Sequence, residues 1–299
     1  MRSAVDDIIE LNLSQSVNVT NTASIRSSVA EWIERDGLDG PPIELMRFHV
    51  LVYCTAGVGQ HMVDFDDYEM TPGTAMWIRP GQVQQWSNVH DDFSAEVVVF
   101  QTSSVPDLPL FDYLHGKTAI TDMGEDADRL RQQIEWMSND LQASQDEALA
   151  AAVVGVLLRL FARHAGGHID NFTAPGHMLA TDFVASIDQN IEQRSVAWHA
   201  QQIGASTRSV ARATAEALGQ SPKDVIGARV ILEAQRRLAW SNDDIATIAR
   251  SLRFSEASNF TKFFRRRTGI SPSEFREAVN QLETSKTDSE RAAFESRLT

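Results

Sequence analysis

Hydrophobic residues follow two different spacings along this chain. Between Glu44 and Gln101, short apolar runs alternate with turn sequences, which include Pro72–Gly73 and Pro80–Gly81. Proline presets φ and glycine accepts positive φ, so both pairs favour tight turns. Several short strands separated by such turns are typical of an antiparallel barrel or sandwich. The pattern therefore predicts a β domain in the first half of the chain.

After Gly124 the apolar positions recur every three or four residues, which is the period of an amphipathic helix. Two flanking helices are predicted here, and the second spans residues 147–164. The first carries four apolar positions on one side: Leu130, Ile134, Met137 and Leu141.

From Met178 onward the pattern predicts only helices. Their expected ranges are 178–193, 196–204, 206–218, 222–239, 243–251, 255–268 and 273–282. Residues able to cap their first turns are Ser206, Asp243, Ser255 and Ser271. The chain is therefore expected to be an α+β protein of two domains, an N-terminal antiparallel β-barrel with flanking helices and a C-terminal all-α domain. Their boundaries are residues 1–170, a linker at 171–177, residues 178–282 and a polar tail at 283–299.

The net charge of −14 is unevenly distributed. Residues 1–180 hold 10 Lys and Arg against 26 Asp and Glu, whereas residues 181–299 hold 17 against 15. Within residues 194–278 the count becomes 14 against 8. Only the second domain therefore has a charge balance suited to a polyanion such as DNA. The acidity of the first is expected to keep it soluble and away from DNA.

Cys54 is the only cysteine, so no internal disulfide can form and no structural zinc cluster is implied. The first fifteen residues carry Asp6, Asp7 and Glu10 in place of the basic and apolar regions of a secretory signal. The longest apolar stretch, 148–158, is shorter than the roughly 20 residues of a membrane helix. We therefore expect a cytoplasmic protein with no membrane partner.

Two segments of the helical region are similar to one another. The segments Gly204–Pro222 and Arg253–Pro272 each contain a tight turn, a longer helix and the sequence Gly-x-Ser-Pro, and each follows a short helix. In a helix-turn-helix the second helix enters the major groove, which is about 12 Å wide, and presents its N-terminal residues to base edges. The duplication predicts two helix-turn-helix units.

Residues 243–276, DDIATIARSLRFSEASNFTKFFRRRTGISPSEFR, resemble the DNA-binding motif of the AraC/XylS family of bacterial transcription regulators. With the weaker first unit and the joining helix, the resemblance covers about a hundred residues. The N-terminal part is similar to the cupin-like sensor domain of the family, chiefly through Gly57–Gly59, Pro72–Gly73 and Pro80–Trp86.

The resemblance implies a sequence-specific DNA-binding regulator, with activation favoured, that is controlled by a small-molecule effector bound in a cupin-like barrel. The implied partners are operator DNA, the effector, a second copy of the chain and RNA polymerase. No cofactor and no enzymatic activity are expected. Two alternatives stay open from the sequence: a cupin-type enzyme with an accessory helical domain, and a constitutive DNA-binding regulator whose barrel serves only dimerisation.

The family pattern also assigns the residues that contact DNA. Those that it places against base edges are Arg208, Ala211 and Arg212 in the first unit and Ala257, Ser258 and Lys262 in the second. Those that it places against phosphates are Ser206, Ser255, Thr261, Arg265, Arg266 and Arg267. Arginine can donate two hydrogen bonds to guanine, whereas phosphate contacts position the protein without reading sequence. For the Arg265–Arg267 run, an ordinary solvated face is the alternative.

Two residues depart from the family pattern. Arg253 stands where the pattern has glycine, so either the second turn tolerates a left-handed arginine or its geometry differs. Thr214 stands where the pattern has an aromatic residue, and few basic residues follow it. We therefore expect the first unit to bind DNA more weakly than the second.

Small antiparallel barrels can enclose one small molecule. Strand alternation places His49, Leu51 and Tyr53 on one face, and the predicted effector pocket consists of His49, Leu51, Tyr53, Trp77, Gln84 and Trp86. The alternative is that these residues belong to the core. Cupin metal sites use several histidines and a glutamate. Here only His61 and Glu69 match, and Gln84 replaces a histidine, so we expect no metal.

The two helices after the barrel resemble the pair through which family members dimerise. The predicted dimer seam consists of Leu130, Ile134, Met137 and Leu141. The alternative is that this stripe packs on its own barrel.

Overall fold

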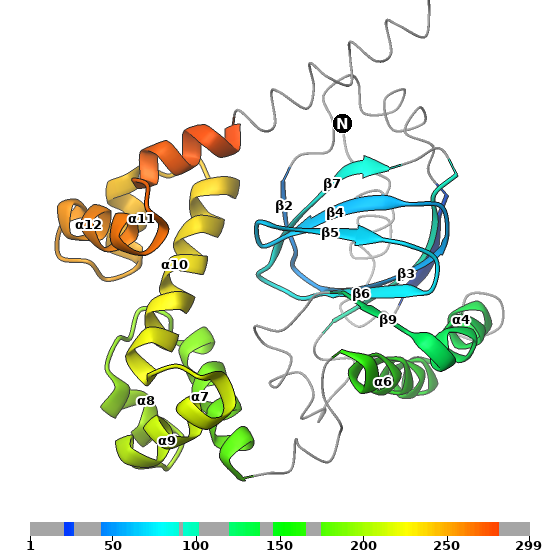
Figure 1. Cartoon of the computed structure of the whole chain (residues 1–299), viewed down its shortest axis with the longest axis horizontal. Coiled ribbons are helices and arrows are strands. Elements are labelled where there is room, and N and C mark those ends of the chain that lie inside the picture. Colours follow the sequence, from blue (N-terminus) through cyan, green and yellow to red (C-terminus); the bar gives the residue numbers. More distant parts are fainter. Residues whose placement is uncertain are drawn as a thin grey trace, which may run out of the picture. The chain divides into compact units, whose positions relative to one another are not determined.

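The computed structural model of the chain forms two compact units (Figure 1). It describes residues 21–26, 43–89, 92–101, 120–137, 146–165 and 175–280. The β unit contains the described residues up to Ala165, and the helical unit runs from Pro175 to Asn280. The predicted α+β class, with β structure first and helices last, is confirmed. Leu141 and the tail at 283–299 lie outside the described residues, as does the linker up to residue 174.

The β unit is built from two antiparallel sheets. Its described strands are β1 (Asn21–Arg26), β2 (Glu44–Leu45), β3 (His49–Ala56), β4 (Gly59–Val63), β5 (Asp66–Met70), β6 (Thr74–Ile78), β7 (Val83–Val89), β8 (Ser94–Phe100) and β9 (Ile120–Asp122). The five-stranded sheet has the order β1-β8-β3-β6-β9, and the four-stranded sheet has the order β2-β7-β4-β5. The predicted antiparallel β domain is therefore confirmed.

Both predicted Pro–Gly turns are present, and each carries the chain from one sheet to the other. In the first, the Thr74 backbone amide donates to the Thr71 carbonyl at 3.0 Å, between β5 and β6. In the second, the Gln82 amide donates to the Arg79 carbonyl at 3.1 Å, between β6 and β7. The two turns therefore bring the sheets face to face.

The two sheets share one hydrophobic core, which we call the interior of the β unit. In the five-stranded sheet, Val52 lies between Met76 and Val97, and directly paired residues of neighbouring strands share a face. In the four-stranded sheet the same core takes Val63 and Trp86. The other buried members of the interior are Met46, Phe48, Val50, Cys54, Met70, Ile78, Phe93, Ala95 and Val99.

Two helices cover the outer face of the five-stranded sheet: α4 (Ala127–Trp136) and α6 (Glu147–His164) (Figure 1). Trp77 of β6 meets Phe161 of α6 edge to face, with 6.1 Å between the ring centroids. Leu130 and Ile134 of α4 are completely buried. The flanking helices predicted from the three-to-four periodicity are present.

A carboxylate without solvent exposure joins the start of α4 to the end of α6. Asp126 accepts hydrogen bonds from Arg129 at 2.7 Å and from His164 at 3.0 Å, and it pairs with Arg163 at 3.0 Å. These partners, His164 first, hold the pKa of Asp126 below its usual value despite burial. The cluster therefore fixes the two helices to one another.

The helical unit consists of short helices connected by tight turns. They are α7 (Pro175–Gln189), α8 (Val196–Gln202), α9 (Thr207–Leu218), α10 (Pro222–Trp240), α11 (Ile245–Ser251), α12 (Ala257–Thr268) and a last helical segment at residues 272–280. The ranges agree with those predicted except at their ends. The helix predicted at Met178 already begins at Pro175, inside the expected linker.

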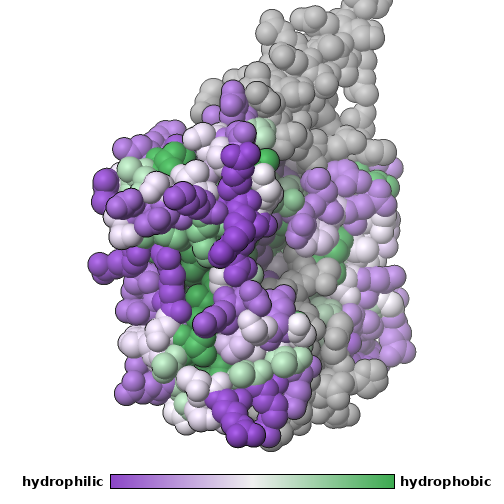
Figure 2. Space-filling view, turned by 60° about the vertical axis from the view of Figure 1, so that its left-hand side comes forward, coloured by the Kyte–Doolittle hydropathy of each residue, from purple (hydrophilic) through white to green (hydrophobic). Residues whose placement is uncertain are grey.

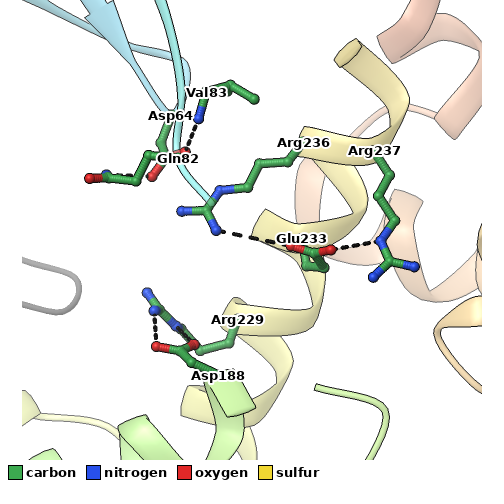
Figure 3. A network of polar contacts seen from close by, with 8 residues as sticks. All are labelled: Asp64, Gln82, Val83, Asp188, Arg229, Glu233, Arg236 and Arg237. Carbon is green, nitrogen blue, oxygen red and sulfur yellow. Dashed lines mark hydrogen bonds and ion pairs between the residues drawn. The ribbon is translucent and has the colours of Figure 1, made fainter. Parts of the chain in front are cut away.

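Polar contacts along α10 hold the helical unit together (Figure 3). The Arg229 guanidinium donates two hydrogen bonds to the Asp188 carboxylate of α7, one of them 2.7 Å long. One turn further on, Glu233 accepts from Arg237 at 2.6 Å and lies 4.0 Å from Arg236. The α10 helix is therefore fixed to the helix that precedes both helix-turn-helix units.

The helix caps were predicted only in part. Ser206 and Ser271 accept from the amides of Ser209 and Glu274 at 3.0 and 3.2 Å, as expected. The cap of α11 is Asp244, not Asp243, and accepts from the Thr247 amide at 2.6 Å. Glu256 takes the cap position of α12 without a side-chain hydrogen bond to the helix, so the prediction of Ser255 was wrong. Each of these two predicted caps lies one residue before the observed cap, which is within the usual uncertainty at a helix start.

Candidate nucleic-acid interface

The first helix-turn-helix consists of α8, a turn at Gly204 and α9. The Ala205 amide donates to the Ala200 carbonyl at 2.8 Å, and Gly204 has a left-handed φ of +66°. His199 is completely buried behind this turn, between the Ser186 hydroxyl at 2.9 Å and the Gln193 carbonyl at 3.1 Å. Burial lowers the pKa of His199, so this histidine is a neutral core residue.

The outward face of α9 brings together the three residues predicted to read bases in this unit. Arg208, Ala211 and Arg212 are exposed, at spacings of three and four residues that place them on one side of the helix. Val210 is fully buried on the opposite side. Thr214, which replaces an aromatic residue of the family pattern, is also buried and donates to the Ala211 carbonyl at 3.4 Å.

The second helix-turn-helix repeats this geometry. The Phe254 amide donates to the Ala249 carbonyl at 2.9 Å, as the Ala205 amide does to Ala200 in the first unit. Arg253 has φ +57° in this turn, so the turn keeps its geometry and holds an arginine in the left-handed region. Such a backbone conformation costs a non-glycine residue about 1 kcal/mol. Of the two possibilities raised by the sequence, the strained arginine is therefore the one present.

The two recognition helices can be aligned from their first residues, Thr207 in α9 and Ala257 in α12, because both helices have 12 residues. Arg208 then corresponds to Ser258, and Arg212 to Lys262. Ser258 and Lys262 are exposed, whereas Ala257 is half-buried and packs against the core of the unit. Ala257 is displaced from the outward face because the second turn is one residue longer than the first.

The residues predicted to contact phosphates divide into two groups. Arg265 and Arg266 are exposed on α12. The side chain of Arg267 is only 25% exposed; it lies 3.4 Å from the Asp224 carboxylate and 5.5 Å from the Phe263 ring centroid. Its guanidinium also packs against Gly227 of α10, where a Cβ atom would approach within 2.2 Å. Arg267 therefore contacts α10 within this conformation.

The remaining predicted phosphate contacts are hydroxyl groups that make local hydrogen bonds. Ser206 caps α9, Ser255 accepts from the Asn259 side-chain amide at 3.1 Å, and the Thr261 hydroxyl donates to the Ala257 carbonyl at 2.9 Å. Thr261 corresponds to Ala211 in the helix alignment and is half-buried.

Two exposed polar residues of the second unit lie near the predicted DNA contacts but were not among them. Asn259 lies next to Ser258 on α12, and Arg253 lies on the turn before it. The helical period starting from Ser258 and Lys262 could have indicated Asn259, which is three residues before Lys262. For Arg253, the sequence shows only a departure from the glycine of the family pattern. Hydrophilic residues cover most of the face of the helical unit that Figure 2 shows.

The residues of the predicted effector pocket are divided between the outer face of the five-stranded sheet and the interior of the β unit. His49 stacks on Phe100 at 4.8 Å and lies 5.6 Å from Trp77, on the face that α4 and α6 cover. Tyr53 shares this face. Burial raises its pKa, and the nearby Arg131 and Asp128 of α4 act on it in opposite directions. His49, Leu51, Tyr53 and Trp77 are therefore outside the interior, because alternation could show that they share a face but not which face looks inward.

Gln84 and Trp86, the other two predicted pocket residues, lie in the interior with His61. The His61 Nε2 atom is 2.5 Å from Gln84 Oε1, and the imidazole stacks on Trp86 with 3.9 Å between ring centroids. Burial lowers the pKa of His61 to about 4, so the imidazole is neutral. Within the described residues, its Nδ1 atom has no hydrogen-bond partner. Glu69 lies on the opposite face of this sheet, because it pairs with Gln60 and accepts from its side chain at 3.1 Å.

The described residues of the predicted dimer seam are buried within the chain itself. Leu130 and Ile134 have no exposed surface, and Met137 is 3% exposed. The outward side of α6 instead presents Leu149 and Val156, which are 41% and 45% exposed. In this conformation, the apolar stripe of α4 therefore packs on its own β unit.

Comparisons with known proteins identify both units. The model of the AraC-like ligand-binding domain matches residues 45–158, and that of a helix-turn-helix domain matches residues 199–278. No curated protein matches the chain. In the part of the chain that the structure describes, no helix is long and apolar enough to span a membrane.

The solved structures that the chain matches are distant in sequence. The unsaturated-fatty-acid-bound ToxT of Vibrio cholerae strain SCE256 is 13% identical, with a TM-score of 0.43 over 88% of this chain and 97% of that one. ToxT of Vibrio cholerae O395 is 12% identical, with a TM-score of 0.41 over 87% and 97%. The AraC-like transcriptional activator CuxR is 14% identical, with a TM-score of 0.32 over 71% and 72%.

The order of the two matched domains agrees with the order of the two units in the structure. The chain belongs to the AraC family of DNA-binding transcription regulators, with an AraC-like ligand-binding domain followed by a helix-turn-helix domain.

Proposed function

We propose that this regulator reads DNA with both recognition helices, α9 and α12, which enter two successive major-groove segments of one duplex. The observation that carries the proposal is the matched register of the helices, which present Arg208 and Arg212 in one unit and Ser258 and Lys262 in the other. Arginine and lysine can donate to guanine, and the neighbouring Asn259 can pair with adenine. Arg265 and Arg266 supply phosphate contacts next to the second segment.

Selection from random DNA tests this proposal. The wild-type protein, Arg208→Ala and Lys262→Ala are each incubated with a pool of random duplexes, and the bound fraction is sequenced. We expect two enriched elements about one helical turn apart, with each variant relaxing one of them. Arg131→Ala removes an arginine from the β unit and is the matched control. Absence of enrichment at low salt, or relaxation of both elements by each variant, would contradict the proposal.

We further propose that the effector binds in the interior of the β unit, beside His61. Within the described residues, the neutral His61 and Gln84 lie among the apolar side chains of the interior, and the Nδ1 atom of His61 is available for a hydrogen bond. These groups suit a compact, largely apolar molecule with one hydrogen-bonding group. A ligand that stabilises the folded protein raises its melting temperature. A panel of such molecules is therefore screened by thermal shift with the wild type, His61→Leu and, as a control on the other face of the sheet, His49→Leu.

The expected result is a shift that His61→Leu abolishes and His49→Leu retains. A shift that both variants retain would place the effector elsewhere. For the effector to regulate transcription, it must bind one arrangement of the protein better than another. We therefore expect it to change the affinity for the selected DNA and to increase transcription by RNA polymerase from a template carrying that DNA.

We propose that the chain acts as a homodimer through the outward side of α6, where Leu149 and Val156 are seven residues apart on one face. Analytical ultracentrifugation of the wild type and of Leu149→Glu/Val156→Glu tests this. A wild-type dimer that the double variant converts to a monomer supports the proposal, and a wild-type monomer contradicts it.

A further inference from the structure

The two helix-turn-helix units are joined at a second place besides α10. Arg194 lies in the connection between α7 and α8, directly before the Ser195 cap with which the first unit begins. Its side chain reaches the turn of the second unit, where the guanidinium donates a hydrogen bond to the Leu252 carbonyl, 58 residues further along the chain. The contact therefore links the two units directly.

Arg194 also packs on aromatic rings of the second unit. Its guanidinium carbon lies 3.5 Å from the centroid of the Phe254 ring and 5.9 Å from that of Phe263. Phe254 is buried and meets Phe260 at 5.2 Å between ring centroids, so the arginine lies on the same aromatic cluster that holds α12. An aromatic ring on which a guanidinium stacks fixes both the position of the guanidinium and the orientation of its plane.

Arg194 forms no ion pair with a carboxylate within the described residues, and partial burial lowers the pKa of its guanidinium. Arg194 is also exposed to solvent, and the groups of the described residues that contact its guanidinium are the two rings and the carbonyl oxygen, all of which come from the second unit. The arrangement is therefore sensitive to the relative position of the two units. The carbonyl that accepts the hydrogen bond precedes Arg253, the strained residue of the second turn, and α12 begins four residues after Arg253.

We propose that Arg194 is a positioning residue, which fixes the distance and rotation between α9 and α12 and thereby makes DNA binding selective for the spacing of the two half-elements. The inference rests on the proposed reading of one duplex by both helices. One inserted base pair moves the second half-element by 3.4 Å and turns it by about a tenth of a helical turn. A rigid pair of helices cannot follow this change, whereas a pair joined by α10 alone can adapt.

The test uses the duplex that the full-length wild-type protein selects, together with duplexes in which one or two base pairs are inserted or removed between the half-elements. A further duplex carries only one half-element. Dissociation constants are measured by fluorescence anisotropy for the wild type, Arg194→Gln, Arg194→Lys and Phe254→Leu. Arg250→Gln serves as the charge control, because the Arg250 guanidinium donates to the Thr247 hydroxyl of its own helix at 2.8 Å.

We expect one inserted base pair to weaken wild-type binding about tenfold, and to weaken binding of Arg194→Gln and Phe254→Leu by less than about threefold. Arg194→Lys should resemble Arg194→Gln, because an ammonium group lacks the planar face. Each variant should bind the duplex with a single half-element with an affinity within about twofold of wild type. Arg250→Gln should show the same loss of affinity on insertion of one base pair as the wild type.

Two outcomes would overturn the inference, and they have different meanings. If the wild type depends on spacing and both Arg194→Gln and Phe254→Leu keep that dependence, Arg194 does not position the helices, although both helices still read DNA. If the wild type itself binds all spacings equally, the two helices do not read one duplex as a rigid pair, and the proposed function fails together with the inference.

Discussion

Arg253 occupies in the second turn the place that Gly204 occupies in the first, and both have a left-handed backbone, with φ of +57° and +66°. Glycine adopts this conformation without strain, whereas other residues do so at a cost. The two turns therefore have the same shape but differ in the energy stored in them.

Replacing Arg253 with glycine should stabilise the helical unit. Relief of the left-handed strain gains about 1 kcal/mol, and the greater freedom of glycine in the unfolded chain removes part of it, so we expect a net gain of about 0.5 kcal/mol. Scanning calorimetry of the full chain measures the change in the transition of the helical unit. Gly204→Ala is the matched control and should lower that transition. An unchanged or lower transition for Arg253→Gly would contradict a strained turn.

Arg266 and Arg267 should differ in how they affect the salt dependence of DNA binding. Arg266 is exposed and is expected to neutralise a phosphate, so Arg266→Ala should reduce the slope of log affinity against log salt by about 0.9. Arg267 is directed toward Asp224 and Phe263, so Arg267→Ala should leave the slope unchanged. Titrations of the selected duplex between low and physiological salt provide both slopes. Equal losses of slope would mean that Arg267 leaves α10 when DNA is bound.

Gly227 and Arg267 should be energetically coupled. A methyl group at position 227 would displace the Arg267 guanidinium, which is the flexible end of its side chain, from Asp224 and Phe263. In an Arg267→Ala background the same Gly227→Ala change should only add helix propensity and stabilise by about 1 kcal/mol. Urea unfolding of the four proteins of this double-mutant cycle measures the coupling, expected at about 1 kcal/mol. Additive effects would rule out the close contact.

Protonation of His61 should destabilise the β unit as the pH falls. The folded pKa of about 4 lies below the ordinary value of 6.5, so the unfolded chain binds a proton that the folded chain excludes. Stability is therefore complete above pH 6.5 and decreases between pH 6.5 and 4, by about 3 kcal/mol for this shift. Unfolding of the β unit is followed across this range for the wild type and His61→Gln. An equal pH dependence in His61→Gln would assign the effect to another group.

The sequence allowed the fold and one of the two recognition faces to be predicted because both depend on local spacing. Arg208, Ala211 and Arg212 are outward because Val210 and Ala213, on the other side of the helix, are buried, and that helical spacing is visible in the sequence. The start of α12 was less predictable, because Glu256 begins the helix without a capping hydrogen bond. As a result, the predicted Ala257 is half-buried, whereas Asn259, which was not predicted, is exposed beside Ser258.

The interior of the β unit could be predicted only in part. The first six residues of β3, beginning at His49, are all buried, so burial itself does not distinguish one face from the other. Only the packing of α4 and α6 on one side decides which residues face the interior. The same packing explains the stripe of Leu130, Ile134 and Met137, which the sequence shows to be apolar without showing what covers it.

Strand β3 contributes residues both to the interior and to the face that α4 and α6 cover, and this limits how the β unit can change during evolution. Neighbouring residues such as Val52 and Tyr53 belong to different sides of the five-stranded sheet, so a slip of one residue would exchange both sides at once. Strands β4 and β7 supply His61, Gln84 and Trp86 to the interior without carrying the residues on which α4 and α6 pack. For an effector bound in the interior, as proposed above, new preferences would therefore arise through substitutions in these two strands, while β3 is held to a single register by the helices outside it.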